Sequence, residues 1–250
     1  MSDMFNNNET YNDEYFRSLI SSSQTNTAER ESRFLVRAYA NLTGAVLLFA
    51  VLEALIFAFV GSEPILRLLA ASPRGVGFGM LGLCILGPMG VNAIIAKSKS
   101  RVGHYVALAT YVVLYTLIFL PILTIAANFC GTAIIGQAIG LTIALFIALT
   151  SAVFMTRADF SFLRSGLVFV GIAAFILIVA SLIFGFELGA WFSAVMILFA
   201  CGYILYDTSN MLQASDVDES CDVLAALNLF GSVMTLFFYI LRLLMAFNRR

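Results

Sequence analysis

The stretch that decides the fold runs from Leu224 to Phe247 and reads LAALNLFGSVMTLFFYILRLLMAF. It is long enough to cross the hydrocarbon core of a bilayer as a helix, which takes about 20 residues. Its polar residues recur every three or four positions, as on one face of an α-helix, and they are Asn228, Ser232, Thr235, Tyr239 and Arg242. A polar stripe inside a membrane faces protein or a water-filled cavity. This helix is therefore predicted to lie in the centre of a bundle.

The composition predicts the class of the whole chain. Hydrophobic residues make up 61% and charged residues 12%, with a mean hydropathy of +0.95, whereas soluble domains have about 25% charged residues. Because backbone groups in lipid must pair within their own segment, all spans should be helices. We predict an all-α integral membrane protein of seven transmembrane helices, the last enclosed by the other six. The expected spans are 34–60, 74–96, 104–127, 132–155, 164–186, 190–212 and 224–247.

Two parts of the chain are expected to differ in order. Residues 1–33 are rich in Asn, Ser, Thr and Glu, which predicts a polar, disordered N-terminal tail. Residues 34–250 form the transmembrane domain, and the lipid bilayer is its first expected partner.

Several function classes are excluded by residue type. A net charge of -1 without a cluster of basic residues argues against nucleic-acid binding. The four cysteines lack metal-site spacing and His104 is the single histidine, so neither a metal site nor a metal hydrolase is expected. Ser232 lacks the context of a serine nucleophile, and the last span has no Schiff-base lysine. We expect no enzymatic activity and no cofactor.

The distribution of basic residues predicts the orientation, since positively charged loops stay cytoplasmic. Of the 14 Lys and Arg residues, nine belong to the side of the N-terminal tail: Arg17, Arg30, Arg33, Arg37, Lys97, Lys99, Arg101, Arg157 and Arg164. We expect a multi-pass protein of the cell (inner or plasma) membrane with a cytoplasmic N-terminus. We predict a full crossing of the last span, since 224–247 is long enough to span, which places Arg250 outside. A re-entrant last segment, the alternative, would return Arg250 to the cytoplasm.

Three ionisable residues inside the spans each cost about 2.5–3.5 kcal/mol on insertion scales and so require an explanation. Glu53 and Arg242 fall at a similar depth, which suggests an intramembrane ion pair, with snorkelling as the alternative.

Asp207 lies near the end of span six that is on the side of the tail, and Ser232 and Asn228 lie near the same end of span seven. Because these helices are antiparallel neighbours, the three residues should meet as a proton or cation site. Alternatively, they only hydrogen-bond two helices together. The acidic residues that follow span six should add like charges near Asp207, and they are Asp216, Asp218, Glu219 and Asp222.

Four segments together resemble the Bax inhibitor family, also called transmembrane Bax inhibitor motif proteins, in a bacterial-type member. They are Thr156-Arg-Ala-Asp-Phe-Ser161, Gly202-Tyr-Ile-Leu-Tyr-Asp-Thr-Ser209, Ala225-Ala-Leu-Asn-Leu-Phe230 and Phe237-Phe-Tyr-Ile-Leu-Arg242. The resemblance covers residues 34–247 and implies that the last helix is enclosed by the others. It also implies a pH-sensitive leak of calcium or another cation, with a role in stress response.

In leak-type members two aspartates on helices six and seven share a proton. Asp207 matches the first, whereas Ser232 stands at the second position, so a coupled pair cannot form although a lone carboxylate can still titrate. Some bacterial members instead modulate a membrane-bound ATP-dependent protease. The alternative function is therefore a non-conducting modulator that such a protease, or another membrane partner, grasps by the tail.

Overall fold

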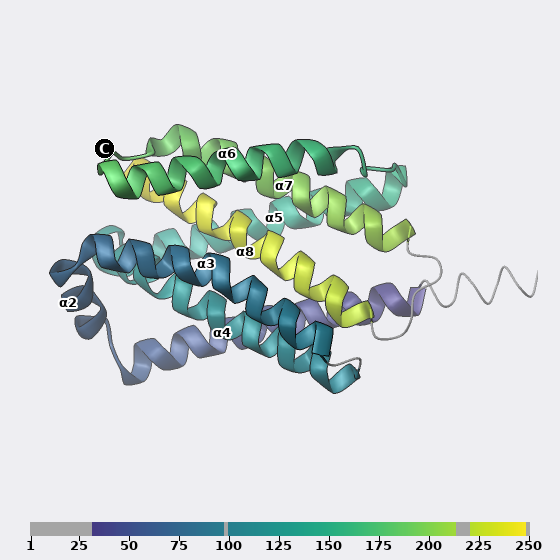
Figure 1. Cartoon of the computed structure of the whole chain (residues 1–250), viewed down its shortest axis with the longest axis horizontal. Coiled ribbons are helices and arrows are strands. Elements are labelled where there is room, and N and C mark those ends of the chain that lie inside the picture. The colour runs from purple at the N-terminus through teal and green to yellow at the C-terminus, as the bar shows by residue number, and fades with distance from the viewer. Residues whose placement is uncertain (1–31, 98–99, 214–220, 249–250) are drawn as a thin grey trace, which may run out of the picture.

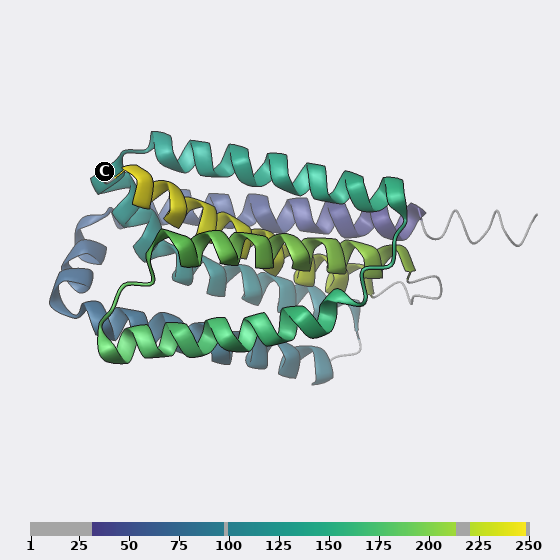
Figure 2. The ribbon, with the colours of Figure 1, turned by 90° about the horizontal axis from the view of Figure 1, so that it is seen from above.

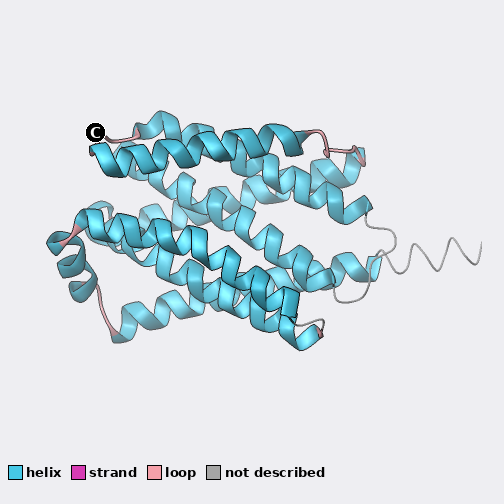
Figure 3. Ribbon diagram, viewed as in Figure 1, coloured by secondary structure: helices cyan, strands magenta, loops and turns pink. Residues whose placement is uncertain are grey.

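The structure of the protein, a computed structural model, describes residues 32–97, 100–213 and 221–248. Within these ranges it is helical, without strands (Figure 3). The helices are Ser32–Phe59, α2 (Glu63–Ala71), α3 (Pro73–Lys97), α4 (Arg101–Ile125) with a π-helical turn at Ala126–Cys130, α5 (Ala133–Thr156), α6 (Leu163–Phe184), α7 (Gly189–Gln213) and α8 (Cys221–Asn248).

Seven of these helices are long and apolar enough to cross a membrane, which confirms the predicted spans to within a few residues. The short helix α2 was not predicted. Gly61, at φ 73°, ends the first helix, and Pro64 lies in the first turn of α2. Proline is favoured there because it has no N–H to leave unpaired. This helix has 9 residues, too few to cross the membrane, and none of them is buried.

Helix α8 crosses the middle of the bundle (Figures 1 and 2). In its most apolar window 67% of the residues are buried, against 44% or less in the other spans, so it is the central helix. It packs against α4, α5 and α7, and the first helix contributes Phe49 to the same buried core. The contacts thus place four spans around α8, and its enclosure by all six stays a prediction.

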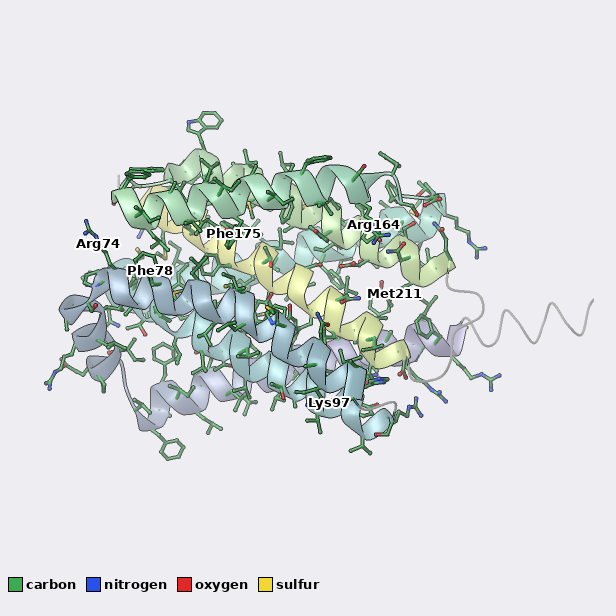
Figure 4. All side chains as sticks on the ribbon, viewed as in Figure 1. Arg74, Phe78, Lys97, Arg164, Phe175 and Met211 are labelled. Atoms are coloured by element: carbon green, nitrogen blue, oxygen red, sulfur yellow. The ribbon has the colours of Figure 1, made fainter. Side chains whose placement is uncertain are left out.

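Labelled basic residues identify the two ends of the bundle. Lys97 and Arg164 lie at the end where the first helix begins, and Arg74 lies at the opposite end (Figure 4). We call the end at which Ser32 begins the first helix the tail-side end, and the end at which Asn248 closes α8 the C-terminal end. Helix α8 runs unbroken from the first end to the second, as a full crossing requires (Figure 1). Which end faces the cytoplasm stays a prediction, and Lys99, Arg249 and Arg250 lie outside the described residues.

An ion pair joins the beginnings of α4 and α8. Arg101 Nη2 lies 3.0 Å from Oδ2 of Asp222, whose side chain is buried. The prediction that Asp222 adds a free like charge near Asp207 is therefore wrong, because this carboxylate lies in the first turn of α8 and is neutralised by Arg101. The other predicted loop acids, Asp216, Asp218 and Glu219, lie outside the described residues.

The loop between α5 and α6 docks on the tail-side end of α7. The Phe160 N–H donates to Ser209 Oγ at 3.1 Å, and Ser209 Oγ lies 3.1 Å from the carbonyl oxygen of Ala158. Hydrogen bonds from Gln213 and Ser161 lower the pKa of Asp159 in this loop to about 2. Asp159 therefore stays ionised near neutral pH. Two segments that carry the family resemblance thus contact each other, two residues from Asp207.

Candidate functional site

Asp207 and Ser232 meet between α7 and α8, as predicted. Ser232 Oγ donates to Asp207 Oδ2 at 2.6 Å, a distance typical of a hydroxyl bound to a carboxylate. The same Oγ lies 3.3 Å from the backbone carbonyl oxygen of Asn228, one helical turn earlier. A serine hydroxyl has one proton to donate, so these two acceptors compete for it.

A cavity of about 300 Å³ surrounds this hydrogen bond between α4, α7 and α8. It is large enough for several water molecules. Asp207 is the one carboxylate among the described residues that line it, and hydroxyl and amide groups supply the other polar atoms. The lining residues are Tyr111, Tyr115, Phe199, Ala200, Tyr203, Asp207, Asn228, Gly231, Ser232 and Thr235.

Tyr111 and Tyr115 are the members of this site that the sequence analysis missed. They lie one turn apart on α4, with their hydroxyl oxygens 3.4 Å from each other. Gly231 allows their close approach to α8, since a Cβ there would lie 2.9 Å from the Tyr111 hydroxyl. The four-residue spacing of two tyrosines in an apolar span is the signal that could have found them.

The polar stripe of α8 divides between two cavities. Asn228, Ser232 and Thr235 line the Asp207 cavity, whereas Tyr239 and Arg242 line a second cavity of about 400 Å³ toward the C-terminal end. The two cavities share three lining residues, Tyr111, Tyr115 and Thr235. Polar groups of α8 therefore line two adjoining cavities that meet at these three residues.

The predicted ion pair between Glu53 and Arg242 is not formed. Both carboxylate oxygens of Glu53 are buried without a hydrogen-bond partner, and the Arg242 guanidinium carbon lies 6.0 Å from the ring centroid of Phe192. Glu53 faces the side of α8 that carries Phe237, because both line one cavity. Five residues further along an α-helix, Arg242 points roughly 140° away. Glu53 and Arg242 therefore lie at a similar depth but on different sides of α8.

A double-mutant cycle tests this separation. Glu53→Gln and Arg242→Gln should change the free energy of unfolding additively, to within about 0.5 kcal/mol, because residues without contact or shared partners act independently. Unfolding of the four proteins in detergent measures the coupling. A coupling of about 1 kcal/mol or more would show that the two side chains interact.

Asp207 is the one acidic metal ligand among the described residues that line this site. The described residues contain no group of three or more His, Cys, Asp or Glu side chains placed to hold a metal ion. A cation beside Asp207 would be held by one carboxylate together with hydroxyl, carbonyl and water oxygens. Such an oxygen set suits hard cations in weak, exchangeable binding.

Comparison with known proteins supports the family resemblance. The family described as Inhibitor of apoptosis-promoting Bax1 matches residues 31–249. The Golgi anti-apoptotic protein of Vaccinia virus (strain Lister) is 34% identical over 134 residues, covering 51% of this chain and 54% of the viral protein. Bax inhibitor 1 of Schizosaccharomyces pombe is 33% identical over 156 residues, which cover 60% of this chain and 55% of the yeast protein.

The mouse protein named Protein lifeguard 4 matches over a greater length. It is 28% identical over 223 residues, covering 87% of this chain and 86% of the mouse protein. This chain therefore spans about half the length of the viral and yeast relatives and most of the length of the mouse relative.

Proposed function

The chain belongs to the Bax inhibitor family, and from that premise we propose that its Asp207 site controls a proton-sensitive leak of calcium or another cation across the membrane. The observation that carries this proposal is the 2.6 Å hydrogen bond between Ser232 and Asp207 in a polar cavity. A carboxylate inside the membrane costs free energy, so its presence beside a cavity supports a functional role.

The geometry around Ser232 provides two hydrogen-bonding states. When Asp207 is ionised, the Ser232 hydroxyl donates to its carboxylate, and the remaining negative charge can attract a cation or water. When Asp207 is protonated, its own O–H can donate to Ser232, whose hydroxyl then turns to the Asn228 carbonyl oxygen 3.3 Å away. Protonation thus removes the charge while every polar atom keeps a partner. A lone carboxylate can therefore switch here without a second aspartate.

The two adjoining cavities support a path for the cation. An ion that leaves Asp207 would pass the hydroxyl groups of Tyr111, Tyr115 and Thr235, which line both cavities. Hydroxyl oxygens replace part of a cation's hydration shell without binding it tightly. Arg242 at the far cavity would repel cations and slow their passage, which fits a leak rather than a fast channel.

The proposed setting is the cell membrane with the tail-side end in the cytoplasm, since the basic residues concentrate there. Asp207 would then sense cytoplasmic pH. The alternative function, modulation of a membrane protease, depends on the N-terminal tail, of which residues 1–31 lie outside the described residues. Nothing in the described part favours it over the leak.

Asp207→Asn tests the proposal. The substitution keeps the shape of the side chain but removes its charge, so the rate of calcium entry into proteoliposomes should fall about tenfold, the equivalent of about 1.4 kcal/mol. Asp159→Asn is the matched control, because that carboxylate is exposed in the loop between α5 and α6 and lies outside the cavity. An unchanged leak in Asp207→Asn would refute the role of this carboxylate.

A further inference from the structure

Arg242 is a charged side chain inside a membrane span that has no counter-charge among the described residues. It forms no ion pair or hydrogen bond with any of them, and its guanidinium carbon lies 6.0 Å from the ring centroid of Phe192. Its side chain is partly exposed, and its nitrogen atoms, unlike the Glu53 oxygens, are not among the covered polar atoms that lack a partner. Charges within membrane spans normally have a partner. Arg242 can therefore still receive an anion from outside the protein.

Arg242 lines the cavity of about 400 Å³ toward the C-terminal end, and it is the one charged residue among the described residues that do so. The lining residues come mainly from α3, α4, α6, α7 and α8, and most of them are apolar. The size is that of a pocket for an organic ligand. An anion that matches both the guanidinium and these walls must carry an apolar part.

The cavity reaches the surface on the side of the bundle that α3 and α6 form. These two helices lie on one side, with α8 behind them (Figures 1 and 2). Cys84, in the middle of α3, lines the cavity and is exposed. An exposed residue in the middle of a membrane-spanning helix faces hydrocarbon. A ligand of this cavity can therefore enter from the bilayer.

The charged end of the cavity lies nearer the membrane surface than the rest of it. Arg242 is roughly 9 Å along the helix axis from the end of α8 at Asn248. Pro88, which also lines the cavity, is roughly 22 Å from the start of α3 at the same end of the bundle. This depth profile matches a single-chain amphiphile in that leaflet, with its charged head at Arg242 and its chain toward the bilayer centre.

We propose that this cavity binds a fatty acid, with its carboxylate on Arg242 and its single chain between α3 and α6. A guanidinium can bind both oxygens of a carboxylate through two parallel N–H donors. Helices α3 and α6 meet near this end, where a Cβ at Gly77 would lie 2.6 Å from Cδ2 of Leu182. A small carboxylate head therefore fits better than the bulkier head of a phospholipid. Binding does not depend on the leak, since Asp207 does not line this cavity.

Direct binding to the protein in phosphatidylcholine nanodiscs tests the proposal, with hexadecanoic acid and hexadecanol as the two probes and each affinity expressed per amount of probe in the membrane. Measurement at about pH 9 keeps the acid ionised, because a membrane raises the pKa of a carboxyl group. The wild type should bind the acid at least about tenfold more tightly than the alcohol, the equivalent of about 1.4 kcal/mol. Arg242→Gln should abolish this preference and leave alcohol binding unchanged, whereas Arg242→Lys should keep part of it. Arg74→Gln is the matched control and should bind as the wild type does, because Arg74 is exposed on α3 at the same end and does not line the cavity.

A second pair of variants tests the place of binding without touching the charge. Cys84→Trp fills the side of the cavity that faces lipid and should weaken acid binding, whereas Ile85→Trp, exposed on the same helix but outside the cavity, should not. Equal affinity of the wild type for acid and alcohol, a preference that survives Arg242→Gln, or unchanged acid binding in Cys84→Trp would each overturn the proposal. Displacement of the acid by phosphatidylglycerol would overturn it in favour of a general site for anionic lipids.

Discussion

Phe119→Ala is expected to lower the free energy of unfolding by about 3 kcal/mol, at the low end of the range for buried Phe→Ala changes. Phe119 on α4 is 1% exposed and packs against the first helix and α8. Its ring centroid is 5.2 Å from that of Phe49 on the first helix, and 5.3 Å and 5.6 Å from those of Phe237 and Phe238 on α8. In lipid the lost transfer term is small, so the loss comes from packing and from the cavity left behind.

The control for this prediction is Phe169→Ala on α6. Phe169 is 74% exposed and faces the surrounding lipid, so its removal should change stability by less than about 0.5 kcal/mol. Unfolding of both variants in detergent with increasing sodium dodecyl sulfate measures the difference. Equal losses would mean that the aromatic cluster around Phe119 does not hold the first helix, α4 and α8 together.

Ser232→Ala is expected to destabilise the protein by about 1.5–3 kcal/mol near neutral pH, the range for hydrogen bonds to charged groups. The substitution removes the donor at 2.6 Å and leaves an ionised Asp207 without it. The loss should shrink as the pH falls, because a protonated carboxyl forms a weaker, neutral hydrogen bond. Unfolding at a series of pH values would show this trend.

Thr235→Ala provides the control for Ser232→Ala. Thr235 lines the same cavity, but its hydroxyl donates to the Gly231 carbonyl oxygen at 2.8 Å rather than to Asp207. Its loss should be smaller and independent of pH. A loss in Ser232→Ala that does not vary with pH would show that Asp207 does not change its protonation state over this range, which would contradict the prediction.

Much of the fold could be predicted from the sequence, because lipid forces each span into a helix and leaves few arrangements for polar side chains. The stripe on α8 predicted the most buried helix for this reason. The contact between Asp207 and Ser232 followed from two antiparallel neighbours with polar groups at one depth. In both cases the spacing of polar residues along a helix and their depth in the membrane were enough for the prediction.

The remaining features depend on rotation about the helix axes, which depth does not determine. Glu53 and Arg242 share a depth, yet Arg242 points away from the face of α8 that Glu53 approaches. Tyr111 and Tyr115 reach the site because Gly231 lets α4 come close to α8, a packing detail between distant segments. The short helix α2 has 9 residues, which is too few to cross the membrane, so the prediction of membrane spans did not include it.

The most direct test of the central claim is the pH dependence of calcium entry into proteoliposomes, measured in one preparation as the pH on the tail-side face falls from about 8 to about 5. The wild-type rate should fall as Asp207 takes up a proton, and the Asp207→Asn rate should be low and flat across the range. Asp159→Asn should follow the wild type, because the pKa of Asp159, about 2, lies below this range. A pH profile in Asp207→Asn that matches the wild type would contradict the account, since another group would then sense the proton.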